Sequence, residues 1–187
     1  MMKIRTGAAV LAAMIAAAPA AQAQSTNDSA ILFGASLGAT LPVGRLGDTQ
    51  GTGFNIQGHA TIRPSSLPFG FRGDLGYWTT PGKSITPIGG GATQNNRGVN
   101  WFTANANVVY NFQGARDATF VPYVLGGVGV YNGSGPVGSA FGVNGGGGVT
   151  FRLSGFDAFA EARVHNVFTD GAASRLIPVS FGITFRP

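Results

Sequence analysis

Apolar and polar residues alternate along most of the chain with a period of two, which is the pattern of β-strands that turn one face toward an apolar environment. In the segment 31–41, for example, Phe33 and Leu37 fall on one face, and Ser36 and Thr40 fall on the other. Eight such segments are separated by turn residues; they lie at 31–41, 54–63, 69–77, 102–112, 120–131, 141–153, 160–165 and 177–186. The segment 120–131 is uniformly apolar, so its facing stays open. The pattern predicts an all-β, antiparallel, up-and-down fold.

The two faces of these segments differ in a way that favours a membrane barrel. The apolar faces carry large aromatic and branched side chains, whereas the opposite faces mix Gly, Ser, Thr and Asn with charges, which suits a narrow lumen. The segments reach about 10–14 residues, longer than most soluble strands and long enough to cross a bilayer when tilted. We therefore expect an eight-stranded transmembrane β-barrel. A soluble secreted β protein with an aromatic core is the alternative.

Aromatic residues gather near the ends of the predicted strands, as two interfacial girdles require. One group comprises Tyr77, Trp78, Trp101, Phe102 and Tyr131, and the other comprises Phe69, Tyr110, Phe112, Phe120 and Phe151. The connections also differ between the two ends. The longer ones are 42–52, 79–98, 132–139 and 169–175, and the shorter ones are 64–68, 113–119 and 154–157. Since the short turns of outer-membrane barrels face the periplasm, we expect both termini on that side.

Composition excludes several other classes of protein. Only 10 % of the 187 residues are charged, 31 are Gly, 14 are Phe, and the mean hydropathy is +0.18, unlike an average soluble domain. No apolar run reaches the roughly 18 residues of a transmembrane helix. The basic residues beyond residue 23 are scattered singly, so we expect no nucleic-acid binding. The absence of Cys excludes thiol chemistry, and the isolated His59 and His165 predict neither a metal site nor a cofactor.

The first residues have the features of a cleaved export signal. Lys3 and Arg5 precede an apolar stretch at 8–18. A small-x-small pattern follows, and the predicted cleavage residues are Ala21, Ala23 and Gln24. The sequence therefore predicts a signal peptide at 1–23 and one β-barrel domain at 24–187.

Four stretches of the predicted strands carry a resemblance to a known family: FGASLG at 33–38, PYVLGGVG at 122–129, FAEARVH at 159–165 and PVSFGITF at 178–185. Through them the chain resembles the small outer-membrane β-barrel family and is similar to the transmembrane domain of outer membrane protein A. The resemblance implies a monomer in the bacterial outer membrane, with membrane lipid and the outer-membrane insertion machinery as partners. It does not imply one function, because such barrels serve as structural proteins, adhesins, narrow pores and lipid-modifying enzymes.

Charged and amide side chains fall on the polar faces of several predicted strands and are expected to meet inside the barrel. A charge in a narrow lumen persists only with partners, so we expect ion pairs that close the lumen. Glu161 is the only glutamate, and Asp74 is the only other acid expected on an inward face, so guanidiniums should share each of them. Glu161 is expected to reach the far wall. The predicted lumen network comprises His59, Arg63, Arg72, Asp74, Asn105, Asn107, Arg152, Glu161, Arg163 and His165.

No motif predicts catalytic residues. At His165 the chain looks like the lipid A deacylase barrels, but Val167 stands where their motif places a Ser, and Ser174 and Ser180 are poor substitutes. The glycines at 145–148 lack the Lys-Ser/Thr of a phosphate-binding loop and are expected to let a strand bend and to leave room in the lumen. The segment 79–98 is the candidate site for a surface ligand of unknown identity, with an unstructured loop as the alternative.

These observations predict a non-catalytic outer-membrane barrel that acts in envelope structure or surface interaction. A narrow solute pore is the next hypothesis. A lipid-modifying enzyme and a soluble secreted β protein follow it.

Overall fold

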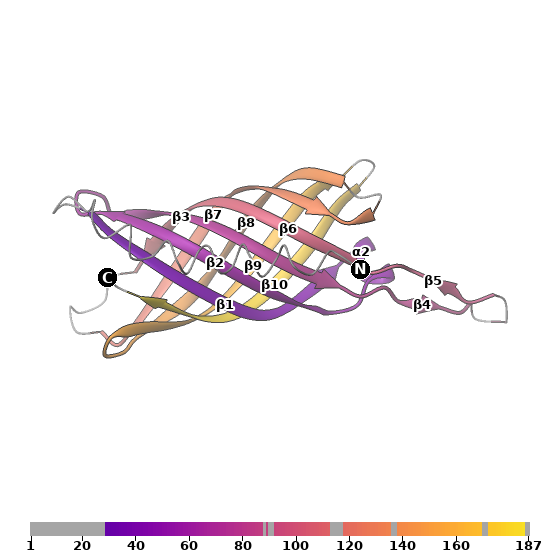
Figure 1. The fold of residues 1–187 in the computed structure, drawn as a ribbon, viewed down its shortest axis with the longest axis horizontal. Coiled ribbons are helices and arrows are strands. Elements are labelled where there is room, and N and C mark those ends of the chain that lie inside the picture. Colours follow the sequence, from indigo (N-terminus) through magenta and orange to yellow (C-terminus); the bar gives the residue numbers. More distant parts are fainter. Residues whose placement is uncertain are drawn as a thin grey trace, which may run out of the picture.

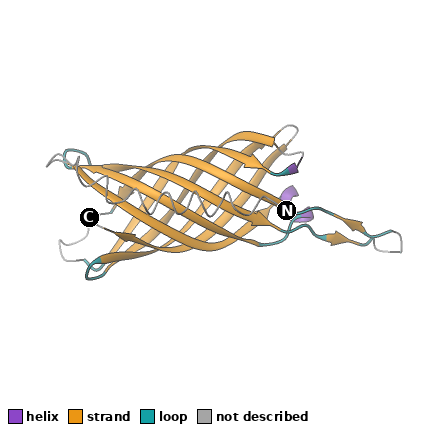
Figure 2. Ribbon diagram, in the orientation of Figure 1, coloured by secondary structure: helices purple, strands orange, loops and turns teal. Residues whose placement is uncertain are grey.

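Eight long antiparallel strands form a closed barrel in the computed structural model of the chain (Figures 1 and 2). The structure describes residues 29–87, 89, 92–112, 118–135, 138–169 and 172–185. The strands are β1 (Ser29–Val43), β2 (Gly53–Pro64), β3 (Phe69–Thr80), β6 (Val99–Asn111), β7 (Phe120–Gly133), β8 (Gly138–Arg152), β9 (Phe156–Thr169) and β10 (Ala172–Phe185). The predicted fold class is confirmed. The predicted signal peptide and its cleavage residues lie outside the described residues.

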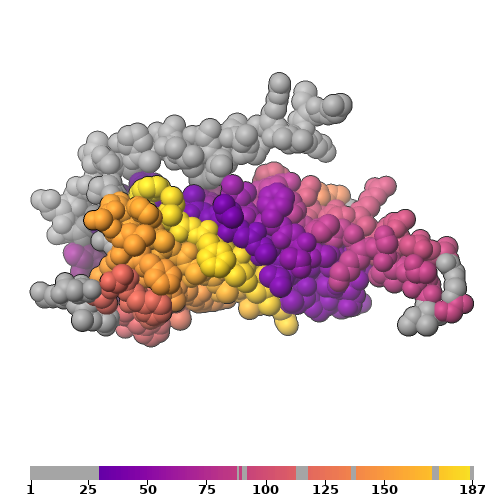
Figure 3. Space-filling view, turned by 90° about the horizontal axis from the view of Figure 1, so that it is seen from below, coloured from indigo at the N-terminus to yellow at the C-terminus, as the bar shows by residue number. Residues whose placement is uncertain are grey.

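The barrel closes where the first strand pairs with the last. β1 and β10 are antiparallel neighbours from Phe33 opposite Phe185 to Val43 opposite Arg175, and they lie side by side, indigo beside yellow, in Figure 3. The order around the barrel is β1-β10-β9-β8-β7-β6-β3-β2, so β3 and β9 stand on opposite walls. Closure leaves none of these strands with an unpaired edge.

Side chains alternate between an apolar outer surface and a polar interior. On β6, Trp101, Thr103 and Asn105 point inward and are buried, whereas Phe102 and Val108 point outward and are about half exposed. A soluble barrel would bury its apolar face, so this arrangement is the inverse of a soluble one. The structure also settles the uniformly apolar β7, where Val121, Tyr123 and Leu125 face the lumen and Val124 and Val128 face outward.

Three aromatic residues that were predicted for an interfacial girdle lie inside the barrel instead. Trp78 and Tyr131 are 0 % exposed and Trp101 is 1 % exposed, so the prediction was wrong for them. Neighbouring residues on a strand face opposite sides, and Tyr77 and Phe102 take the outward positions. We call the inward group the apolar plug; it comprises Trp78, Val99, Trp101, Tyr131, Val167 and Leu176. At the opposite end, Tyr110, Phe112, Phe120 and Phe151 face outward as predicted.

The apolar plug lies at the end of the barrel that carries the longer connections, which we call the loop end. There the short helix α2 (Arg45–Thr49) follows β1, and its Leu46 packs against the plug. The hairpin β4 (Ser84–Ile85) and β5 (Gln94–Asn95) extends beyond the barrel at the same end (Figure 1). The described part of 79–98 is thus structured. No helix among the described residues has the length and apolar character that a membrane-spanning helix requires.

Two connections that were expected to be long loops are short. β7 extends to Gly133 and β8 begins at Gly138, while β9 ends at Thr169 and β10 begins at Ala172. Ser174, which was expected to lie in the connection 169–175, pairs with Val167 within the sheet. The connections at the loop end are therefore longer than those at the other end only between β1 and β2 and between β3 and β6. The other end, where β1 begins and β10 ends, is called the terminal end below.

Candidate functional site in the barrel lumen

Four charged side chains from opposite walls form a closed ring across the lumen. Arg72 on β3 donates from Nε to Oδ1 of Asp74 at 2.8 Å and from Nη1 to Oε2 of Glu161 at 2.8 Å. Arg163 on β9 donates from Nη2 to Oδ1 of Asp74 at 3.0 Å and from Nε to Oε1 of Glu161 at 2.6 Å. Each carboxylate is thus shared by both guanidiniums, and two positive charges meet two negative charges. We call these four residues the ion-pair ring.

The order of charges along two strands explains why the ring forms. Arg72 and Asp74 are two positions apart on β3, and Glu161 and Arg163 are two positions apart on β9, so each pair projects from one face of its strand. The strands between β3 and β9 are each antiparallel to the next, so β3 and β9 run in the same direction. The base precedes the acid on β3, whereas the acid precedes the base on β9. Each base therefore lies opposite an acid across the lumen.

Neutral neighbours occupy the remaining bonding positions of the ring. Nδ2 of Asn107 donates to Oδ2 of Asp74 at 2.6 Å, and the Tyr123 hydroxyl donates to Oε2 of Glu161 at 2.7 Å. Nη2 of Arg72 lies 3.1 Å from Nδ1 of His59. Both acids and both arginines are at most 6 % exposed, and a buried charge is stable only when it is paired and hydrogen-bonded in this way.

His165 and Asn105 belong to a second cluster, nearer the apolar plug. The Tyr131 hydroxyl donates to Oδ1 of Asn105 at 2.7 Å and lies 2.7 Å from Nδ1 of His165. The imidazole of His165 also packs edge-on against Trp78, with ring centroids 4.6 Å apart. Tyr123 and Tyr131 were not predicted as lumen residues, because the apolar run in which they lie shows no alternation.

Arg63 and Arg152 lie outside the ion-pair ring. Arg63, near the end of β2, donates from Nη2 to Oδ1 of Asn111 at 3.4 Å. Arg152 is exposed at the end of β8, opposite Asp157 in the register. Asp157 is itself 4 % exposed on the inward side of β9, so the expectation that Asp74 and Glu161 are the only inward acids was wrong. The segment 154–157 was expected to be a turn, but β9 begins at Phe156 and pairing places Asp157 on the wall.

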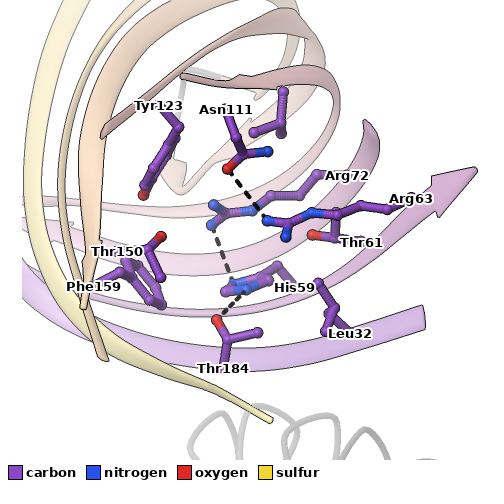
Figure 4. A pocket seen from close by; sticks show the side chains of 11 residues that line it. Leu32, His59, Thr61, Arg63, Arg72, Asn111, Tyr123, Thr150, Phe159 and Thr184 are labelled. Carbon is purple, nitrogen blue, oxygen red and sulfur yellow. Dashed lines mark hydrogen bonds between the residues drawn. The ribbon is translucent and has the colours of Figure 1, made fainter. Parts of the chain in front are cut away.

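A small cavity of about 30 Å³ opens beside the ring toward the terminal end (Figure 4). His59, Arg72 and Tyr123 line its buried part, and Arg63 and Asn111 line its half-exposed part. Three levels therefore follow one another along the lumen: the apolar plug at the loop end, the ion-pair ring, and this cavity.

Two glycines of the run 145–148 face the lumen and allow close packing there. A Cβ atom on Gly146 would lie 2.7 Å from Cα of Arg163, and one on Gly148 would lie 2.6 Å from the Tyr123 hydroxyl. A Cβ on Gly145 would meet only the carbonyl oxygen of Leu125, at 3.8 Å. The inward glycines thus let the β8 backbone approach the residues that hold the ring.

The described residues offer little to metal or acyl-transfer chemistry. No three His, Asp or Glu side chains among them gather as metal ligands. Val167, two positions after His165, lies in the apolar plug. Ser180 is 2 % exposed, and its hydroxyl donates to Oδ1 of Asn55 at 2.8 Å.

Comparison with known proteins places this architecture among small outer-membrane barrels. Neither a protein-family model nor a curated protein sequence matches the chain. Neisserial surface protein A is 15 % identical with a TM-score of 0.62, covering 85 % of this chain and 99 % of that one. A major outer membrane protein of Thermus thermophilus is 14 % identical (TM-score 0.52; 85 % and 99 %), and the N-terminal barrel domain of Pseudomonas aeruginosa OprF is 12 % identical (0.50; 85 % and 100 %). The chain has the fold of these barrels, and the expected outer-membrane location agrees with it.

Proposed function

We propose that the chain is a non-catalytic outer-membrane barrel with a closed lumen, which acts in envelope structure or in interactions at the cell surface. The observation that carries the proposal is the ion-pair ring. The four side chains make four contacts of 2.6–3.0 Å, and two of these, from Arg72 to Glu161 and from Arg163 to Asp74, join opposite walls. An ion that crosses the lumen would have to separate buried ion pairs, and separating such pairs is costly.

The apolar plug supports the same proposal, because it forms a second barrier in series with the ring. Its members are at most 9 % exposed, and they fill the loop end with two indole rings and branched side chains. Hydrated ions avoid such constrictions unless the constriction widens. A solute that entered from the loop end would meet the plug before it met the ring.

A non-catalytic role is supported by the surroundings of His165. The imidazole is fully buried between Tyr131 and Trp78, inside the lumen and away from the lipid-facing surface. Each Ser considered as a nucleophile is placed elsewhere: Ser180 is bonded to Asn55, and Ser174 lies 3.5 Å from the Thr169 hydroxyl at the loop end. Neither of these Ser hydroxyls lies beside the imidazole, and a membrane lipid would have no access to it.

The β4–β5 hairpin supports a role at the surface. The backbone N–H of Lys83 donates to the Thr49 carbonyl at 2.8 Å, and Nε2 of Gln50 donates to the Arg97 carbonyl at 2.9 Å, so the α2 connection holds the base of the hairpin. Further out, the hairpin carries hydroxyl and amide side chains and the exposed Ile85. A projecting element with a fixed base is suited to contact another molecule.

Planar-bilayer recording tests the closed lumen. The purified barrel, inserted into a bilayer from detergent, should give at most small and intermittent currents. A wide and steady channel in the unmodified protein would overturn the proposal and favour the narrow solute pore.

A further inference from the structure

The loop end carries more basic than acidic residues. Its segments 44–52, 81–98 and 169–175 contain four basic residues, Arg45, Lys83, Arg97 and Arg175, all of them exposed. The same segments contain two acids, Asp48 and Asp170, and Asp170 lies outside the described residues. In the part of the chain that the structure describes, none of the four basic side chains forms an ion pair with an acid. The loop end therefore presents a net positive charge to its surroundings.

Three of the basic residues are gathered at the short connection that contains α2. Arg45 is the first residue of α2. Nζ of Lys83 donates to the Gly47 carbonyl at 2.6 Å, and the Arg97 carbonyl accepts from Nε2 of Gln50 at 2.9 Å. Figure 1 shows α2 beside the base of the β4–β5 hairpin. The positive charge is thus concentrated where β1, α2 and the hairpin meet.

Arg175 extends this charge onto the outer wall of the barrel. Leu176 is 0 % exposed and faces the lumen, so its neighbour Arg175 faces outward. Arg175 pairs with Val43 at the end of β1, and Arg45 follows Val43 by two residues. Because α2 also contacts β10, Arg45 and Arg175 lie at the same junction of β1 and β10.

An apolar strip continues from Arg175 along the outer wall toward the terminal end. The next outward residues of β10 include Ile177 and Phe181, which pair with the outward Leu41 and Leu37 of β1. Leu37 and Phe181 are 67 % and 62 % exposed, as expected of side chains that face hydrocarbon. A guanidinium at the upper end of such a strip lies at the boundary between hydrocarbon and headgroups, where basic side chains attract anionic lipids.

We propose that Arg45 and Arg175 bind the phosphate group of a membrane lipid at the loop end, while an acyl chain of that lipid lies along the strip formed by β1 and β10. Phosphate suits the two guanidiniums, because each planar fork can donate to two phosphate oxygens. The lipid is favoured over a free anion because the apolar strip continues directly from the charge. The site depends on the location of the barrel in a membrane and not on closure of the lumen, so a conducting lumen would leave it unaffected.

Phosphatidic acid is the probe, because it joins a phosphate monoester to acyl chains. In bilayer nanodiscs of zwitterionic phosphatidylcholine, replacement of a growing fraction of the lipid by phosphatidic acid should shift the methyl NMR signals of Val43 and Ile177 saturably. In the double variant Arg45→Gln and Arg175→Gln, the fraction needed for half-saturation should rise about 10-fold or more. Arg152→Gln is the matched control, because Arg152 is an exposed arginine at the terminal end, and it should leave that fraction unchanged.

Inorganic phosphate added to nanodiscs of phosphatidylcholine alone distinguishes the lipid from a free anion. It should give no saturable shift; saturation by inorganic phosphate to the same extent would show a site for free phosphate and overturn the lipid assignment. The proposal would also fail if phosphatidic acid gave no saturable shift, or if the double variant bound it like the unmodified protein. If the double variant does not fold, Arg175→Gln alone should raise the half-saturating fraction about 3-fold or more, and an unchanged fraction would contradict the proposed role of Arg175.

Discussion

Arg72 and Glu161 stand on opposite walls of the barrel, and Nη1 of the arginine donates to Oε2 of the glutamate at 2.8 Å. The two residues are 89 positions apart in the chain, and the contact spans the lumen. Because both side chains are buried, removing one partner should cost more stability than it would at a surface ion pair, since the other charge would be left buried without its counter-charge.

The first prediction concerns this pair. Glu161→Gln should lower the free energy of unfolding by about 1–3 kcal/mol, because both arginines lose a buried charged partner. Urea titration in lipid vesicles measures the change. In a double-mutant cycle with Arg72→Gln, the coupling energy should be about 0.5–3 kcal/mol. Arg152→Gln, at the exposed end of β8, serves as the surface control. Additive effects of Arg72→Gln and Glu161→Gln would show that the two side chains do not interact.

The second prediction concerns the two barriers in series. Replacement of Trp78 and Trp101 by Ala should thin the apolar plug, but the ion-pair ring should still block current. Glu161→Gln alone should leave the plug in place. The combination of all three changes should raise conductance far more than either variant does. Conductance that opens fully with Glu161→Gln alone would show that the plug is no barrier.

The third prediction concerns the outer surface. Val143→Arg, on the outward face of β8, should cost roughly 2–4 kcal/mol of folding free energy in a bilayer, because the charge would face hydrocarbon. Val143→Ala controls for the loss of the valine. Leu41→Arg, near the loop end of β1, should cost less because it lies closer to water. Equal costs at the two positions, measured by unfolding in vesicles, would contradict the placement of the membrane.

The fourth prediction concerns the glycines of β8. Gly146→Ala should destabilise the barrel by about 1–3 kcal/mol, because its Cβ would press on the β9 backbone beside Arg163. Gly145→Ala is the matched control on the adjacent residue, where the added methyl would make only an ordinary contact with the Leu125 carbonyl oxygen at 3.8 Å, and it should be neutral or slightly stabilising. Thermal unfolding compares the two variants. Equal loss of stability in both would indicate that chain flexibility, rather than close packing, explains the run.

Several lumen residues could be found from the sequence because each follows from its own strand. His59, Arg72, Asp74, Asn107, Glu161 and Arg163 alternate with apolar neighbours, so their inward direction needs no knowledge of other strands. The predictions failed where the pattern was weak or stopped. Trp78 and Trp101 are apolar residues on an inward face, and a hydrophobicity pattern places such residues outside, whereas Tyr131 lies in an apolar run without alternation. Arg152 and Asp157 lie at strand ends, where alternation does not show how far pairing extends.

The sequence by itself determined the class of fold, the number of long strands and the face of most side chains, because period-two alternation is a local property of each strand. Only the tertiary structure decided which charges meet. The ion-pair ring depends on β3 and β9 lying on opposite walls, and that follows from closure between β1 and β10 and from the register of every pair between them. A shift of one residue in any pair would turn that strand's polar face outward. The contact between Arg72 and Glu161 is therefore a property of the closed barrel as a whole.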